Sequence, residues 1–149
     1  MTKVWTYLID KDLNEQELSK LKAEGVAFVN QWTAHENPLA ASFEIYKNKI
    51  IVVKVDESQH GASGCSVDKL LRFIKQSENE FQINLLNRLL VAVETNDGIK
   101  AIPSSSIKDK IVSREMTGET LVYDTAVANG EAFETWLKPL KTTWLNKYL

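Results

Sequence analysis

The feature that most constrains the fold is the apolar run Ile50-Ile51-Val52-Val53-Lys54-Val55, which leads through glycines into an amphipathic helix. A nearly continuous run of β-branched residues is typical of a strand buried on both faces, so we expect it at the centre of a sheet. The segment Ser42 to Tyr46 alternates in polarity, and Lys47-Asn48-Lys49 favours a tight turn because Asn tolerates a positive φ. The two segments therefore predict a hairpin whose second strand is central.

One further strand and two helices are predicted around this hairpin. Val4 to Ile9 has the composition of a strand. Asn14 followed by Glu17 is a variant of the capping box, and apolar residues at helical spacing follow it, which predicts a first helix. Gly25 lowers the propensity of that helix, which indicates close packing at this position. Apolar residues at i, i+3, i+4 and i+7 predict a second helix over about 67–80.

The C-terminal half predicts a second hairpin, a last strand and helical segments. The turn Thr95-Asn96-Asp97-Gly98 separates the two strands of this hairpin. Pro139 interrupts a stripe of apolar residues at helical spacing, either as a kink or as the first turn of a separate final helix. The predicted strands are 85–93, 99–102 and 120–123, and the predicted helical segments are 107–111 and 133–148.

The order of these elements predicts the fold class. Strand, helix, strand, strand, helix, strand is the order of a ferredoxin-like βαββαβ unit. We therefore expect an α+β fold: a mostly antiparallel sheet with helices packed on it, a ferredoxin-like core and a C-terminal extension. A chain of 149 residues fits a single domain over 1–149.

Composition excludes several classes of partner. Eighteen Lys and Arg against 20 Asp and Glu give a net charge of −2 with no long basic run, so nucleic acid is not an expected partner. No apolar run approaches the length of a membrane span, and the first residues lack the pattern of a signal peptide. The single cysteine agrees with a reducing compartment, and we expect a cytoplasmic protein with a free thiol and no cofactor.

The junction between the central strand and the second helix is the candidate site. If the ferredoxin-like order holds, the loops 33–40 and 56–66 meet at one end of the sheet, together with the Thr95 to Gly98 turn. The polar residues that this arrangement gathers on one surface are His35, Glu36, Asp56, Glu57, His60, Cys65, Asp68, Glu94 and Asp97.

Cys65 is the candidate nucleophile of this junction. It is expected in the first turn of a helix, where the dipole and free N–H groups favour a thiolate. His35 or His60 would act as its base and Asp56 would orient the imidazole. The alternatives are that Cys65 is a small buried packing residue and that His35 is only a favourable cation past a helix C-terminus.

The same junction offers groups for an anion or another small ligand. The first helical turn has unpaired backbone N–H groups, and the candidate ligand-binding residues around it are Glu57, Gly61, Ser63, Gly64, Ser66 and Asp68. Asp68 has a simpler interpretation as a favourable charge in the first turn. Asp56 and Glu57 would suit Mg²⁺ with a substrate phosphate, but the spacing of His60 and Cys65 matches no standard zinc pattern, so no metal site is predicted.

The glycine junction also invites comparison with a phosphate-binding loop. A Walker A loop reads G-x-x-x-x-G-K-[ST], whereas Gly64 follows Gly61 by three residues and Cys65 stands where lysine is required. ATP hydrolysis is therefore not supported by the sequence.

Four motifs carry a resemblance to a known family. They are Trp32-Thr33-Ala34-His35, Val55-Asp56-Glu57, Ser63-Gly64-Cys65-Ser66-Val67-Asp68-Lys69 and the tail from Trp136-Leu137-Lys138-Pro139 to Trp144. With them the chain resembles, over most of its length, a family of small uncharacterised bacterial proteins that often carry the genome label "ABC transporter ATPase". The resemblance implies one cytoplasmic domain and implies no role for any residue.

Two functions follow as hypotheses. The first is a small-molecule or anion site at the junction, which includes the possibility of a thiol-dependent enzyme and requires an accessible Cys65. The second is a non-enzymatic interaction module or homo-oligomer that uses the aromatic C-terminal segment or an open sheet edge.

Overall fold

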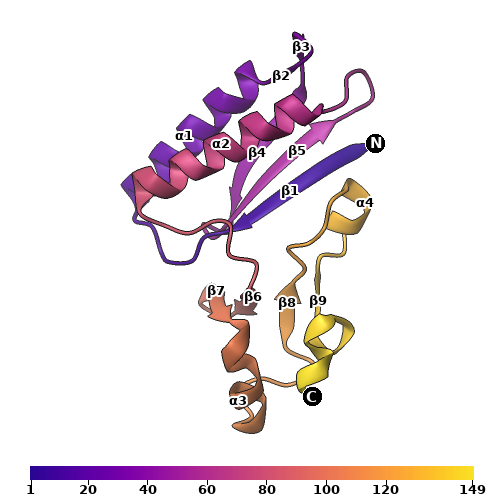
Figure 1. Ribbon diagram of the computed structural model, residues 1–149. Coiled ribbons are helices and arrows are strands. Elements are labelled where there is room, and N and C mark those ends of the chain that lie inside the picture. The colour runs from indigo at the N-terminus through magenta and orange to yellow at the C-terminus, as the bar shows by residue number, and fades with distance from the viewer.

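The computed structural model describes residues 1–149 as two main antiparallel sheets, each with helical segments on its outer side, and a small two-stranded sheet (Figure 1). Helices and antiparallel strands pack together, which confirms the predicted α+β class. The chain forms the first sheet and its two long helices before residue 82, and it forms the second sheet after residue 89.

The first sheet has the strand order β1-β5-β4, with bounds Thr2–Leu8, Ile50–Asp56 and Ala40–Tyr46. The apolar strand β5 is central, as predicted, because its residues are buried on both faces of the sheet. Lys47 and Asn48 adopt φ values of 47° and 61° in the turn between β4 and β5, which confirms the predicted hairpin.

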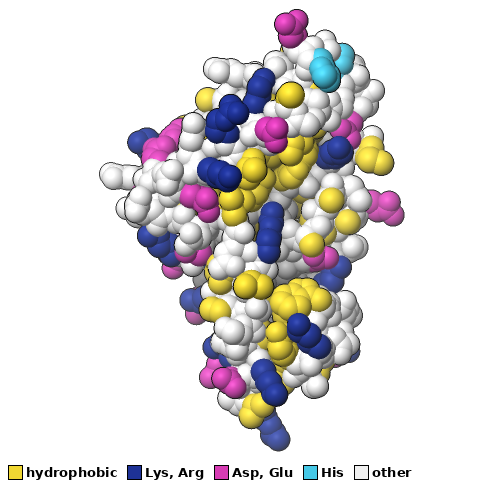
Figure 2. Space-filling view, viewed as in Figure 1, with side chains coloured by type: hydrophobic (Ala, Val, Ile, Leu, Met, Phe, Trp, Pro, Cys, Tyr) yellow, Lys and Arg dark blue, Asp and Glu magenta, His cyan; other side chains and the backbone are white.

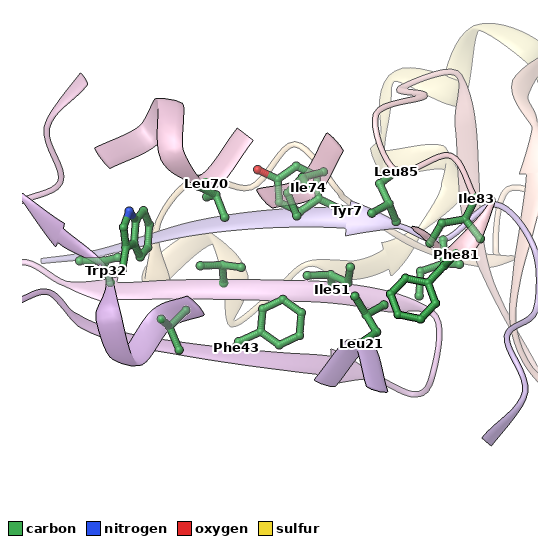
Figure 3. Close-up of a cluster of buried hydrophobic side chains, with 14 of the residues drawn as sticks. Tyr7, Leu21, Trp32, Phe43, Ile51, Leu70, Ile74, Phe81, Ile83 and Leu85 are labelled. Carbon is green, nitrogen blue, oxygen red and sulfur yellow. The ribbon is translucent and has the colours of Figure 1, made fainter. Parts of the chain in front are cut away.

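Two helices cover one face of this sheet, α1 (Glu15–Gln31) and α2 (Gly64–Phe81) (Figure 1). Asn14 and Glu17 form the predicted capping box at the start of α1. Between the helices and the sheet lies the largest buried cluster, in which Trp32, Phe43 and Leu70 take part (Figure 3).

Gly25 of α1 lies directly against this sheet. A Cβ atom at position 25 would overlap with the ring of Phe43, which is buried in β4. Phe73 of α2 packs edge-on against the same ring, with 6.0 Å between the ring centroids. The close packing expected at Gly25 is therefore confirmed, and the Phe43 ring lies between α1 and Phe73.

A two-stranded hairpin, β2 (Thr33–Ala34) and β3 (Asn37–Pro38), follows α1 where the sequence predicted a loop. Its turn residues His35 and Glu36 adopt φ values of 50° and 69°. Pro38 is compatible with this short strand because it lies at the exposed edge of the molecule.

The second sheet has the strand order β7-β6-β8-β9. The bounds are Leu90–Thr95 for β6, Gly98–Pro103 for β7, Leu121–Tyr123 for β8 and Leu137–Pro139 for β9. The turn into β7 uses Gly98 at a φ of 107°, as the Thr95 to Gly98 pattern predicted.

The ferredoxin-like arrangement is not confirmed, because β6 does not join the first sheet. A ferredoxin-like unit would place this strand beside β1. In this structure the segment 125–129 contacts that edge instead: the Val4 N–H donates to the Ala128 carbonyl at 3.0 Å, and Lys3 forms an isolated bridge with Asn129. Strand β6 pairs with β7 and β8.

The predicted C-terminal helix over 133–148 is also wrong. The segment contains a single turn of helix, α4 (Gly130–Phe133), then β9, then the 3₁₀ turns η2 (Leu140–Thr142) and η3 (Trp144–Tyr148). Pro139 lacks an N–H and is tolerated at the end of the edge strand β9, where a helix interior would not accept it.

Two further buried clusters hold the second sheet in place. One fills the space between the sheets, where Val4, Ile50 and Tyr123 meet, and the other lies on the far side of the second sheet, where Val93, Ile107 and Leu140 meet. The helical segments on that side are η1 (Ser104–Ser106), α3 (Ile107–Val112), η2 and η3. The layers are therefore helices, first sheet, second sheet and helical turns.

We expect the substitution Gly25→Ala to lower the free energy of unfolding by about 1–3 kcal/mol, because the overlap with Phe43 outweighs the gain of roughly 1 kcal/mol in helix propensity. Urea denaturation measures the change. Gly64→Ala is the matched control, since a Cβ atom there meets nothing within 4 Å and stability should fall little or not at all. Equal stability of Gly25→Ala and the natural protein would contradict the packing argument.

Candidate functional site

The structure brings the two predicted loops together at one end of the first sheet. Asp56 at the end of β5 stands in register with Ala40 of β4 and with Thr2 of β1. The Trp32 indole N–H donates to the Ser66 carbonyl at 2.8 Å, which ties the end of α1 to the start of α2. Loops 33–40 and 56–66 therefore lie at the same end, as the sequence predicted.

The two carboxylates of this junction hydrogen-bond to the loop itself. The Ser58 N–H donates to Asp56 Oδ1 at 3.0 Å, and this bond holds the pKa of Asp56 below its ordinary value. The Ala62 N–H donates to Glu57 Oε2 at 2.9 Å, and a Cβ atom at Gly61 would lie 3.0 Å from the same oxygen. These contacts close the loop after β5.

The two serines of the junction cap α2. The Ser66 N–H donates to Ser63 Oγ at 3.2 Å, and the Ser63 N–H donates to Ser66 Oγ at 2.6 Å. Ser66 is buried, while Gly64 between them is exposed. The capping box therefore satisfies the backbone N–H groups of Ser63 and Ser66 at this helix start, which an anion would otherwise contact.

The remaining residues of the predicted site are exposed and do not contact one another through hydrogen bonds. His35 is in the β2–β3 turn, His60 in the loop after β5, and Cys65 and Asp68 in the first turns of α2. The interpretation of Cys65 as a buried packing residue is wrong, because the thiol is free and exposed. No group of three or more His, Cys, Asp or Glu side chains is arranged to hold a metal ion.

Glu94 lies at the opposite end of the first sheet from this junction, so its predicted place beside Asp56 is wrong. The Lys47 ammonium and the Tyr123 hydroxyl each donate to Glu94 Oε2 at 2.6 Å. Lys47 belongs to the β4–β5 turn, at the far end of β5 from Asp56. Asp97 lies on the same hairpin as Glu94 and is separated from the junction for the same reason.

The contacts of Glu94 connect the two sheets and shift two pKa values. The hydrogen bonds from Lys47 and then from Tyr123 lower the pKa of Glu94. Burial raises the pKa of Tyr123, and its hydrogen bond to the Glu94 carboxylate raises it further. The Tyr123 ring packs against Trp136, with centroids 4.8 Å apart, so this polar contact borders the cluster between the sheets.

A large cleft lies elsewhere, along the outer edge of β1. It is a cleft of about 900 Å³ lined by 20 residues, of which 12 are hydrophobic. The lining comes from β1, from the start of β6 and the connection before it, from β8 and the segment after it, from β9, from the C-terminal turns η2 and η3, and from one residue of α2. Figure 2 shows apolar side chains gathered between the two halves of the molecule, with Lys and Arg among them. The lining residues are Lys3, Val4, Trp5, Thr6, Val67, Arg88, Leu90, Val91, Val122, Tyr123, Asp124, Thr125, Ala126, Val127, Ala128, Lys138, Thr142, Thr143, Trp144 and Leu145.

The charged groups of the cleft are three cations and one carboxylate. Lys3 Nζ is 3.8 Å from Glu57, a residue just outside the lining, and Lys138 Nζ is 3.5 Å from Asp124. The Arg88 guanidinium donates from Nη1 to the Thr6 carbonyl at 2.9 Å. No carboxylate lies within ion-pair distance of Arg88.

Sequence reasoning missed this cleft. Arg88 stands in the connection between α2 and β6, in a segment predicted to be a buried strand, and no motif surrounds it. The cleft is made from short segments that are far apart in the chain. A charged residue inside the apolar segment 85–93 was the one available signal.

No protein-family model, no curated protein and no solved structure matches this chain. None of its helices combines the length and the apolarity needed to cross a membrane.

We expect Glu94→Gln to lower the free energy of unfolding by about 1–2 kcal/mol at neutral pH, because it removes the charge that Lys47 and Tyr123 contact. The pKa of Glu94 is lower in the folded protein than its ordinary 4.5, so this stabilisation is present above about pH 4.5. It is lost as the pH falls through the lower folded value. Urea denaturation at a series of pH values measures the free energy of unfolding of both proteins, and we expect the difference between them to shrink as the pH falls. Asp97→Asn, which alters an exposed carboxylate of the same hairpin, is the control; a constant difference at every pH would contradict the assignment.

Proposed function

We propose that this protein binds a small organic molecule in the cleft along the outer edge of β1. The carrying observation is a hollow of about 900 Å³ with a mainly apolar lining and a few converging polar groups. Binding sites for small molecules have this size and this composition, since the apolar wall supplies affinity and the few polar groups fix orientation.

The aromatic wall of the cleft supports this proposal. Trp144 lines the cleft and is 54% exposed, so a large apolar side chain stands open to solvent beside a hollow. Its own neighbours are Tyr148, with ring centroids 6.4 Å apart, and the Lys147 ammonium at 5.2 Å from its ring. A ligand that covers an exposed tryptophan at the border of a pocket removes its apolar surface from water, and this burial favours binding.

A second candidate function concerns the junction after β5. The exposure of Cys65 satisfies the requirement of the thiol hypothesis, and the residue occupies the first turn of α2. The anion-binding part of that hypothesis is weaker, because Ser63, Ser66 and Glu57 already hydrogen-bond within the loop and the helix cap. ATP hydrolysis is no part of either proposal, since Cys65 stands where a phosphate-binding loop requires lysine.

The cleft proposal is tested with phenylnaphthylamine, an uncharged apolar dye whose fluorescence rises on binding. We expect saturable binding of one dye per chain. Trp144→Ala should weaken this binding by about tenfold, which corresponds to the loss of one aromatic contact of roughly 1.4 kcal/mol. Fluorescence titration measures the dissociation constant.

Leu121→Ala is the matched control, because Leu121 is also a large exposed apolar residue but does not line the cleft. Its dye affinity should equal that of the natural protein. Absence of dye binding would overturn the proposal. A dimer that Trp144→Ala converts to a monomer, seen by size-exclusion chromatography, would favour the homo-oligomer instead.

The thiol candidate is tested by alkylation of Cys65 with iodoacetamide. Because the thiol is exposed, we expect the native protein to be modified at a rate comparable to that of the unfolded protein, as mass spectrometry measures it. The pH profile of the native rate then reports the pKa of the thiol. A midpoint below the unperturbed value of about 8.5 favours a tuned nucleophile, and a thiol that reacts only after unfolding would end this candidate.

A further inference from the structure

We propose that the ligand of the cleft is an organic anion and that Arg88 binds its charged group. The inference rests on the proposed function and adds the chemical class of the ligand: an apolar or aromatic body that carries one carboxylate-like or phosphate-like group. It follows from how the cations of the cleft are paired.

Arg88 is held in place without losing most of its donors. Its Nη1 donates to the Thr6 carbonyl at 2.9 Å, and its guanidinium carbon is 5.5 Å from the centroid of the Tyr7 ring. A guanidinium has five N–H donors in one plane, and one hydrogen bond to a carbonyl leaves the others available. The side chain is therefore oriented at the β1 edge of the cleft with donors free for a ligand.

Arg88 also differs from the other cations of the cleft. Lys3 and Lys138 each have a carboxylate within 4 Å, Glu57 and Asp124 respectively. Arg88 is exposed, its one hydrogen bond within the protein goes to a carbonyl oxygen, and it lies over a ring face; neither group neutralises its charge. An anion that enters the cleft would form the missing ion pair, and Arg matches the two oxygens of a carboxylate or phosphate in a bidentate geometry.

The charge of the cleft contrasts with the charge of the whole chain. The protein carries a net charge of −2, yet three cations and a single carboxylate line the cleft. A hollow with an excess of positive charge and apolar walls attracts anionic ligands, because its field is less screened than that of an open surface. The same walls, which include Trp5, Val127 and Trp144, favour an apolar body over a bare inorganic ion.

The test compares two dyes that differ in one charged group. Anilinonaphthalene sulfonate is an anion, and phenylnaphthylamine has the same ring skeleton without the sulfonate. Both are titrated into the full-length natural protein, into Arg88→Gln and into Arg72→Gln. Arg72 is an exposed arginine of α2 that does not line the cleft, so its substitution makes the same change in net charge elsewhere.

We expect Arg88→Gln to weaken binding of the sulfonate dye by about tenfold or more and to leave the uncharged dye within about twofold of its natural affinity. Arg72→Gln should leave both affinities within twofold. Lys138→Gln should weaken the sulfonate dye less than Arg88→Gln does, since Lys138 is already paired with Asp124. Inorganic phosphate alone should not displace the sulfonate dye at equal concentration.

The possible failures are distinguishable. Equal loss of both dyes in a folded Arg88→Gln protein, checked by circular dichroism, would overturn the anion inference and leave the cleft as a binding site. Equal sulfonate affinities in Arg88→Gln and Arg72→Gln would overturn it in the same way. Failure of the natural protein to bind either dye would overturn the proposed function as well. If Arg88→Gln does not fold, Arg88→Lys takes its place in the comparison. Lysine keeps the charge but lacks the planar guanidinium, so this variant should weaken binding of the sulfonate dye and leave binding of the uncharged dye unchanged.

Discussion

The burial of β5 on both faces is the constraint on which the rest of the structure depends. Ile51 and Val53 point toward the helices, whereas Ile50 and Val52 point toward the second sheet. A sheet with an apolar central strand must be covered on both sides, and two helices can cover only one of them. The C-terminal half supplies the second cover, and its own outer face is closed by α3 and the 3₁₀ turns. The layered order of the molecule follows from this single strand.

Local features of the fold were predictable because they are determined by neighbours in the sequence. The capping box of Asn14 and Glu17 and the turn at Lys47 and Asn48 each depend on a few adjacent residues. The partner of β6 was not predictable in this way. The apolar run over 85–93 indicates a strand, but it does not determine which edge the strand joins, and the edge of β1 is contacted by the segment 125–129. The apolar spacing after residue 133 was misleading because Trp136 lies between the sheets and Leu140 lies beyond the second sheet.

The candidate site was only partly accessible from sequence, for a related reason. Pairing of β4 with β5 correctly placed His35 and Asp56 at the same end of the sheet. Whether a polar atom there is free for a ligand depends on bonds such as that from the Ala62 N–H to Glu57, which spacing alone does not reveal. The cleft was not predictable because segments far apart in the chain form it. The orientation of Arg88 depends on the carbonyl and the ring that it contacts in the fold, and the sequence does not show these contacts.

The position of Arg88 also affects how the chain behaves toward other copies of itself. Where a strand edge is left open, its unpaired backbone groups can template pairing with another chain and so begin aggregation. The outer edge of β1 is only partly closed: no strand of the second sheet pairs along it, and the segment 125–129 contacts it at Val4 and Lys3 alone. Arg88 occupies the Thr6 carbonyl, and Lys3 places a further charge on the same edge. These two cations prevent the part of the β1 edge beside the cleft from pairing with a strand of another chain.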